Sequence, residues 1–128
     1  MSDLRLESAP FSFEGRNYTL RCNMNVLADV QDAYGGDIAP ALSGRGTLRS
    51  VLEFLAAMMN DYADEQGWFD PDPYTGETVL PERFTRRKLG RKLRREDIPM
   101  VQIFALVTAA VAPKNAKESE PDPDDPGN

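Results

Sequence analysis

TLRSVLEFLAAMMNDYADEQ, residues 47–66, is the stretch that decides the predicted fold. Thr47 is a good N-cap residue because its hydroxyl can accept a hydrogen bond from a free amide of the first helical turn. Gly67 can end the helix in a left-handed backbone conformation. The apolar residues between them recur at the spacing of one helix face: Leu48, Val51, Leu52, Leu55, Met59 and Tyr62. The sequence therefore predicts a long amphipathic helix with one buried side.

Upstream of this helix, residues 11–22 are predicted to form a β-hairpin. Apolar and polar side chains alternate on both sides of Gly15, which is the period of a strand with one buried face. Gly15 can adopt the positive φ that a tight hairpin turn needs. Because two strands alone are marginally stable in water, we expect helices to cover the apolar face of the hairpin.

A shorter helix is predicted at residues 25–34, between the hairpin and a double glycine. Val26, Val30 and Tyr34 fall on one face of this helix, and the glycines can end it. Residues 37–42 are expected to add one short helical turn before a flexible loop leads to the long helix.

Three segments follow the long helix. Residues 67–81 contain three prolines and two glycines, which predicts a long loop. Residues 82–95 are predicted to form a basic helix with a thin apolar stripe, weakened by Gly90. Residues 97–111, capped by Asp97, are predicted to form a last helix that is apolar nearly all round. Such a helix is typical of a buried centre or of a subunit interface.

The predicted fold class is mainly α, with an N-terminal β-hairpin packed on a small bundle of about four helices. The chain of 128 residues suits one domain, which we place at residues 11–112. Residues 1–10 are expected to form a flexible N-terminus. Residues 113–128 are polar, acidic and rich in proline, so we expect a disordered acidic tail there.

The composition excludes several kinds of active site. The chain has no histidine and one cysteine, so it cannot build a Ser-His-Asp triad, a Cys-His pair or a zinc site. The acidic residues 70–77 lack the spacing of a calcium-binding loop. Cys22 has no partner base and is expected to be a small buried hydrophobic residue. We therefore expect no catalytic residues, no metal, no cofactor and no enzymatic activity.

Charge is unevenly distributed along the chain. The net charge is −6, but residues 82–97 carry eight basic side chains against three acidic ones. Such a run predicts a face that meets either the acidic N-terminal part of the same domain or an acidic partner. Nucleic acid is disfavoured as a partner because the rest of the chain is acidic. The predicted basic docking face consists of Arg83, Arg86, Arg87, Arg91 and Arg94.

The segment FEGRNYTLR, residues 13–21, is followed by the helix at residues 25–34 and a double glycine. This order resembles the opening of the tail assembly chaperones of long-tailed bacteriophages and related prophages, in which a G-x-x-Y-x-L-R hairpin leads into a helix, a short turn and a second, long helix. The resemblance covers residues 11–66, and it extends over residues 67–112 only through their helical, apolar character.

The resemblance implies a small, non-enzymatic, mainly helical protein. Such chaperones coat the hydrophobic tape-measure protein, keep it soluble and recruit tail-tube subunits, and they leave before the virion is complete. The implied location is thus the cytoplasm of the bacterial host and not the mature virion. The partners implied are the tape-measure protein first and then the tail-tube protein. A second copy of the chain is a further candidate partner, because the apolar last helix could form a subunit interface. No membrane partner is expected, since the longest apolar stretch, residues 98–112, is shorter than the about 20 residues of a membrane span.

A protein that binds a long apolar helical client needs exposed apolar helix faces, and methionines suit adaptable binding surfaces. We place the client-binding faces on the long helix and on the last helix, at Met58, Met59, Tyr62, Ile103, Phe104 and Val107. The alternative function is a small phage-type nucleic-acid-associated or head-to-tail connector protein that acts through the basic helix at residues 82–95.

Overall fold

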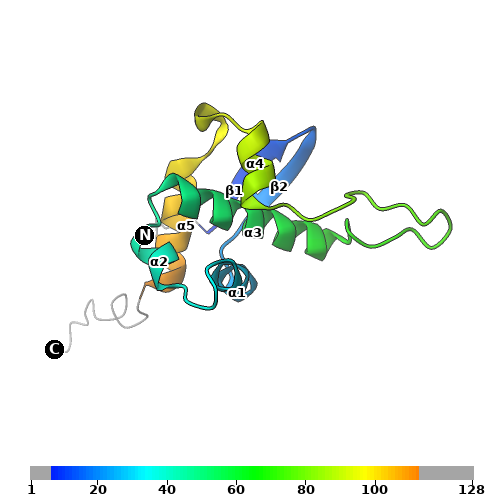
Figure 1. Cartoon of the computed structure of the whole chain (residues 1–128). Helices are drawn as coiled ribbons and strands as arrows, with labels where there is room; N and C mark the ends of the chain where they lie inside the picture. Colours follow the sequence, from blue (N-terminus) through cyan, green and yellow to red (C-terminus); the bar gives the residue numbers. More distant parts are fainter. Residues whose placement is uncertain (1–6, 113–128) are drawn as a thin grey trace, which may run out of the picture.

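The long amphipathic stretch forms the central helix of the protein. A computed structural model describes residues 7–112, and in it helix α3 spans Leu48–Gln66 (Figure 1). The Thr47 side chain accepts a hydrogen bond from the Ser50 amide, and Gly67 ends the helix with a φ of 74°. Both ends of the predicted helix are thus confirmed. Helix α3 packs against strand β2 and helices α1, α4 and α5, so it organises the whole fold.

The N-terminal hairpin consists of strands β1, Ala9–Phe13, and β2, Arg16–Leu20, which pair in antiparallel orientation. Both turn residues have a positive φ, 51° at Glu14 and 81° at Gly15, as a two-residue turn of the primed type requires. Ala9 is buried and lies opposite Leu20. The prediction of a flexible N-terminus was therefore wrong for residues 9 and 10, because they complete the strand pair.

Aromatic side chains join the hairpin to the far end of α3. Tyr18 of β2 packs edge-on against Tyr62, Trp68 and Phe84, with ring centroids 5.5–6.0 Å apart. Phe84 also meets Phe13 of β1 at 5.8 Å. This cluster covers the apolar face of the hairpin, as the two-stranded sheet requires.

Two helices connect the hairpin to α3. Helix α1, Met24–Ala33, is capped by Asn23, whose side chain accepts a hydrogen bond from the Val26 amide at 3.0 Å. Helix α2, Ala39–Ser43, is a short helix with a proline near its start. The Tyr34 hydroxyl meets the buried Ser50 hydroxyl at 2.8 Å, so the end of α1 is tied to the start of α3.

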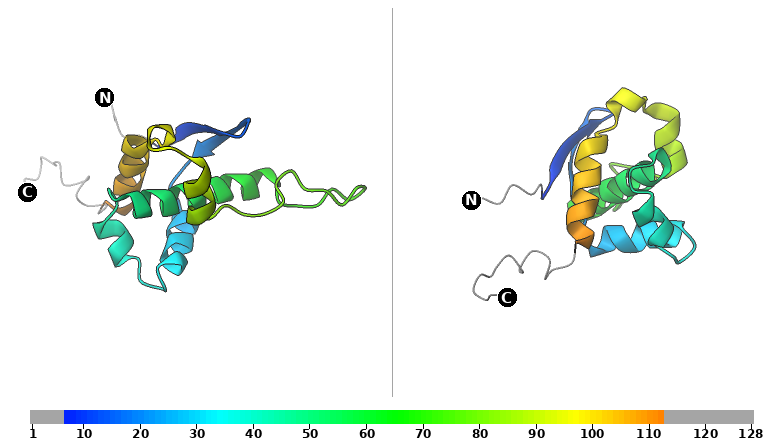
Figure 2. Two further views of the ribbon diagram at one scale, coloured as in Figure 1. Left: turned by 45° about the horizontal axis from the view of Figure 1, so that its top comes forward. Right: turned by 90° about the vertical axis from the view of Figure 1, so that its left-hand side faces the viewer.

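The C-terminal part contains helix α4, Arg86–Lys92, the 3₁₀ turn η1, Arg95–Asp97, and helix α5, Met100–Val111. Figure 2 (right), which looks along α3, shows the hairpin and α5 on one side of it and α4 on the other. The core is shared by the hairpin and the α-helices and contains, among others, Leu20, Val30, Phe54, Leu89 and Ile103. The mainly helical fold with an N-terminal hairpin is thus confirmed.

The predicted bounds of the last two helices were wrong. The basic helix covers only residues 86–92 of the predicted 82–95, because Thr85 caps its start and Leu93 adopts an extended conformation. Asp97 does not cap α5, since its carboxylate accepts a hydrogen bond from the Arg94 amide within η1. Helix α5 is neither fully buried nor fully exposed, because Ile103 is buried whereas 79% of Val101 is exposed.

None of the helices between residues 7 and 112 has the length and apolar character of a membrane crossing. The predicted acidic tail, residues 113–128, lies outside the described residues.

Candidate docking groove

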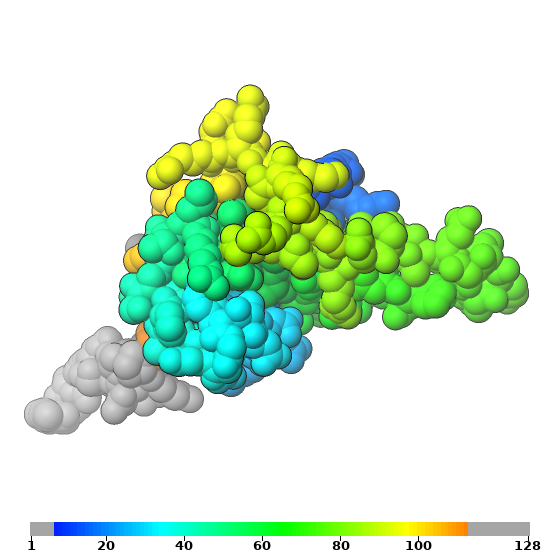
Figure 3. All heavy atoms as spheres, in the orientation of Figure 1, coloured from blue at the N-terminus to red at the C-terminus, as the bar shows by residue number. Residues whose placement is uncertain are grey.

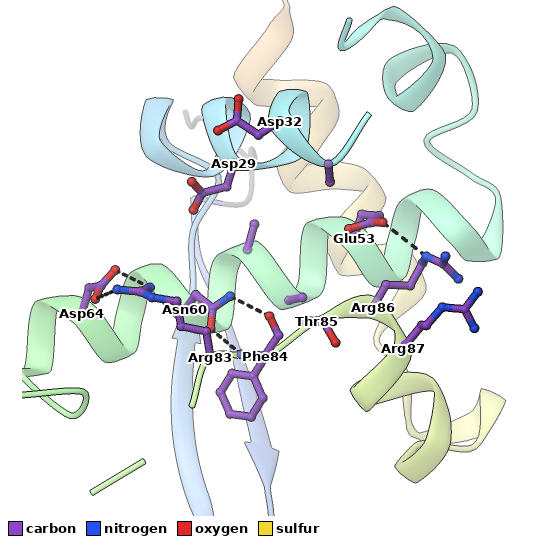
Figure 4. Close-up of a pocket in the computed structure, with 13 residues that line it drawn as sticks. Asp29, Asp32, Glu53, Asn60, Asp64, Arg83, Phe84, Thr85, Arg86 and Arg87 are labelled. Carbon is purple, nitrogen blue, oxygen red and sulfur yellow. Dashed lines mark hydrogen bonds and ion pairs between the residues drawn. The ribbon is translucent and has the colours of Figure 1, made fainter. Parts of the chain in front are cut away.

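An open groove of about 890 Å³ runs between α1, α3 and the segment at residues 83–87 (Figure 4). Its floor consists of the small side chains of Ala56 and Ala57 on α3, and Ala33 lies at its α1 edge. Ala56 and Ala57 are 4% and 5% exposed. Small side chains keep the groove open and let another backbone come close to α3. We call this feature the α1–α3 groove.

One wall of the groove is acidic. Asp29 and Asp32 of α1 line it, and neither forms an ion pair with another residue of the described chain. Partial burial raises the pKa of Asp29, the Arg83 guanidinium lowers it, and the carboxylates at positions 32, 61 and 64 raise it further. The wall therefore presents two carboxylates that have no ion-pair partner among the described residues.

The opposite wall is held in place by Asn60 of α3. The Asn60 side-chain Nδ2 donates a hydrogen bond to the Phe84 carbonyl oxygen at 2.9 Å, and its Oδ1 accepts one from the Phe84 backbone amide at 2.8 Å. This pair of bonds fixes the backbone of an otherwise irregular segment against α3. It thereby positions Arg83, just before this point, and Arg86 and Arg87, just after it, along the groove (Figure 4).

The first basic residues of this wall are bound to α3. Arg83 donates two hydrogen bonds to Asp64, at 2.7 and 2.9 Å, and its guanidinium lies 4.6 Å from the ring centroid of Phe69. The hydrogen bonds to Asp64 raise the pKa of Arg83. Arg86 meets Glu53 at 3.2 Å in a less exposed pair. Two of the five predicted docking arginines therefore meet the acidic part of the same domain.

The other predicted docking arginines have different surroundings. Arg87 and Arg91 are exposed and form no ion pair with another described residue. Arg94 lies beyond α4 and pairs locally with Glu96 and Asp97, at 3.4 and 3.7 Å. The five arginines do not form one helical face, because α4 contains only three of them.

The predicted client-binding faces are mostly inside the protein. Met58, Met59, Ile103 and Val107 are at most 1% exposed, so the prediction that they form exposed faces was wrong. The physical reason is that α3 is covered by the hairpin, α1, α4 and α5 together, which buries most of its circumference. Tyr62 is half-buried in the aromatic cluster.

Phe104 is the one predicted client-binding residue with a largely exposed side chain, at 42%. Together with Val101 and Met100 it lines a small apolar hollow of about 250 Å³ beside the start of α3. Its ring also lies 5.3 Å from the Arg45 guanidinium. Besides the α1–α3 groove, the outer side of α5 is therefore an exposed surface with apolar character.

Sequence reasoning missed the residues that build the groove: Asp29, Asp32, Ala33, Ala56, Ala57 and Asn60. A signal for the acidic wall existed, because aspartates three positions apart share one helix face. The adjacent alanines inside an otherwise large-residue helix were a second signal. Neither pattern indicates which other segment lies opposite.

The remaining predicted sites have a structural explanation. Asp72 accepts hydrogen bonds from the amides of Tyr74 and Thr75, so it stabilises a turn. Between residues 7 and 112, no group of three or more acidic or cysteine side chains is close enough to hold a metal ion. Cys22 is half-buried, and burial raises the pKa of its thiol to about 11. Its thiolate is thus scarce near neutral pH.

Comparisons of the chain with protein-family models, with curated proteins and with solved structures find no match.

Proposed function

We propose that the protein is a non-enzymatic tail assembly chaperone of the long-tailed phage type, which binds a helical segment of a tape-measure protein in the cytoplasm of the bacterial host. The proposal rests on the resemblance of residues 13–21 and of the helices that follow them. The observation that carries it is the α1–α3 groove, whose small-residue floor lies between an acidic wall and a basic wall.

The shape of the groove suits an α-helix as its occupant. A helix approaches a surface most closely where the facing side chains are small, and the alanine floor provides such a surface. A helical client with an apolar or small-residue seam would lie over that floor. Its basic edge would face Asp29 and Asp32, and its acidic edge would face Arg87.

The outer side of α5 extends the proposed client surface. Val101 and Phe104 are exposed there, and apolar side chains on a surface helix commonly mark a contact with another protein. The proposal assigns Phe104 a place in the client contact. The proposed client then contacts the domain at two places, one of them charged and one apolar.

Co-expression with a tape-measure protein tests the proposal. The tape-measure protein should become soluble when the chain is present and should co-purify with it. Ala33→Phe, which places a large ring at the α1 edge of the groove, should reduce the recovered complex at least about tenfold, since obstructing the groove should remove about 1.4 kcal/mol or more of binding free energy. Ala28→Phe makes the same change on an exposed part of α1 outside the groove and should bind normally.

Two results would contradict the proposal. One is a tape-measure protein that stays insoluble in the presence of the wild-type chain. The other is equal loss of complex with both phenylalanine variants, which would mean that α1 is damaged and that the groove is not the binding site.

The alternative function, binding of nucleic acid through the basic segment, is favoured by one observation: Arg87 and Arg91 are exposed and unpaired among the described residues. Titration with duplex DNA at two salt concentrations tests it. Binding that weakens steeply with salt and is lost in the double variant Arg87→Ala, Arg91→Ala would support this function. Absence of binding at low salt would reject it.

A further inference from the structure

The loop between α3 and α4 forms a projecting arm, which we define as residues 67–81. It extends well beyond the body of the domain, away from the end of α3 (Figures 1 and 3). At its base, the Leu80 amide donates to the Trp68 carbonyl oxygen at 2.9 Å, and Trp68 packs against Tyr18 and Tyr62. The arm is thus anchored to the aromatic cluster at one end only.

The tip of the arm is held in one conformation by its own hydrogen bonds. The Asp72 amide donates to the Glu77 carbonyl oxygen at 2.7 Å, and the Gly76 amide donates to the Asp72 carbonyl oxygen at 2.8 Å. The Asp72 carboxylate accepts from the Tyr74 amide at 2.7 Å. A segment ordered in this way loses little conformational entropy when it binds.

The tip presents one large aromatic ring. Tyr74 is 94% exposed, the highest value among the exposed large hydrophobic residues of the described chain. Asp70, Asp72 and Glu77 surround it in the sequence, and residues 67–81 contain no basic side chain. Tyrosine is enriched among the residues that contribute most to protein interfaces, because its rigid ring buries a large area. The tip therefore has the character of an acidic aromatic anchor.

A pocket that matches this anchor lies at the base of the same arm. It has a volume of about 360 Å³ and lies between the hairpin turn, residues 80–84 and α4. Its walls are mainly apolar and include Phe13, Phe84 and Leu89. We call it the basal pocket.

The rim of the basal pocket is basic. Four basic side chains line the pocket against two acidic ones: Arg83, Lys88, Arg91 and Lys92 against Glu14 and Glu82. Lys88 and Lys92 are paired with those two acids, at 2.7 and 2.6 Å. Arg91 is exposed and has no ion-pair partner among the described residues. The rim can therefore accept an acidic group from outside.

We propose that two copies of the chain dimerise by reciprocal arm exchange, in which Tyr74 of each copy inserts into the basal pocket of the other. Leu80 and Pro81 form part of the pocket wall, so the base of the arm and the pocket are one structure. The paired base directs the arm away from the body of the domain, so its tip projects into solvent (Figure 3). Two arms that lie side by side in opposite directions bring each tip to the partner's base. A two-fold axis relates the two contacts, which closes the assembly at a dimer.

Charge supports this pairing and opposes contact between two tips. The acidic tip meets a rim with excess positive charge, whereas tip-to-tip contact would bring together the carboxylates of Asp72 and Glu77 from both arms. The basal pocket borders the α1–α3 groove, with which it shares Arg83 and Phe84, but the dimer does not depend on the proposed client.

Sedimentation of the full chain over a wide concentration range tests the dimer. The wild type should shift from monomer to dimer as its concentration rises. Tyr74→Ala should raise the dimer dissociation constant at least about tenfold, as expected for a central aromatic anchor. Tyr74→Phe should keep most of the affinity because it retains the ring. Met24→Ala truncates a side chain that is 77% exposed on α1 and should change nothing.

A charge exchange distinguishes the proposed pairing from any other contact of the arm. Glu77→Arg and Arg91→Glu should each weaken the dimer, and the double variant should recover part of the loss. A wild type that stays monomeric, or a dimer unaffected by Tyr74→Ala, would overturn the proposal. If the wild type is monomeric and Tyr74→Ala also reduces recovery of the tape-measure protein, the arm contacts the client and not a second copy of the chain.

Discussion

Arg83 and Arg86 differ from Arg87 and Arg91 in their surroundings, although all four belong to one basic segment of the chain. The first two reach back to carboxylates of α3, at 2.7 and 3.2 Å. The second two are exposed and have no ion-pair partner among residues 7–112. One charge run thus has an inner half, which attaches the segment to the domain, and an outer half, which presents charge to other molecules.

The largest effect is expected from Asn60→Ala, which would release the segment at residues 83–87 from α3 and so remove the difference between its inner and outer arginines. The substitution removes both hydrogen bonds to the Phe84 backbone. Each such bond contributes about 0.5–1.5 kcal/mol, so we expect a loss of about 2 kcal/mol in the free energy of unfolding. Urea denaturation measures this loss. Asn25→Ala removes one long, exposed bond of 3.4 Å to Asp61 and serves as the matched control. Equal stability of the two variants would contradict the role of Asn60.

A smaller effect on the free energy of unfolding should distinguish the inner arginine Arg86 from the outer arginine Arg87. Arg86 and Glu53 are 33% and 15% exposed at their side chains, so their pair is screened less than a surface pair. We expect Arg86→Ala to lower the free energy of unfolding by about 1 kcal/mol. Arg87→Ala should stay within about 0.5 kcal/mol of the wild type. If both variants lose the same stability, the distinction between inner and outer arginines is wrong.

Gly90→Ala should stabilise α4, the helix that carries the outer arginines Arg87 and Arg91. An added Cβ at Gly90 would lie 3.9 Å from the nearest Leu52 carbon, which is ordinary contact. Glycine inside a helix is less favourable than alanine by up to about 1 kcal/mol. Thermal unfolding should therefore shift to higher temperature. An unchanged or lower midpoint would indicate a clash that the structure does not contain.

The smallest effect is expected at Asp29, on the acidic wall of the α1–α3 groove, across from the inner arginines Arg83 and Arg86. Burial raises the pKa of Asp29, so the folded state binds its proton more tightly than the unfolded state does. This stabilising contribution is present below the unfolded pKa and is lost as the pH rises through the folded one. Asp29→Asn should hence increase stability slightly, by less than about 0.5 kcal/mol at neutral pH, and the gain should vanish in acid. Denaturation at both pH values checks the sign, and a gain that persists in acid would exclude protonation as its cause.

The sequence was sufficient for those elements whose pattern is local. The hairpin alternates around Gly15, and the Leu48–Gln66 helix has a cap, a periodic face and a closing glycine, so each contains its own start and stop signals. The basic helix was predicted too long because its charged residues favour helix without marking where it begins. Its beginning depends on Asn60, which is distant in sequence and holds Phe84 outside the helix by two hydrogen bonds to its backbone.

The candidate site was much harder to predict than the fold. Met58 and Met59 have the composition of a binding surface, but the hairpin and the C-terminal helices cover them. The groove instead depends on which segments lie opposite each other across α3. Asp29 and Arg87 become two walls of one groove only when α1 and residues 83–87 pack against the same helix.

By itself, the sequence determined the mainly helical class, the central helix, the hairpin and the absence of histidine chemistry, because periodicity, caps and composition are properties of short segments or of the whole chain. Only the tertiary structure decided which apolar faces stay exposed, which arginines are neutralised and where the arm lies relative to its pocket. These features depend on contacts between residues far apart in the sequence, and burial and ion pairing exist only once those contacts form.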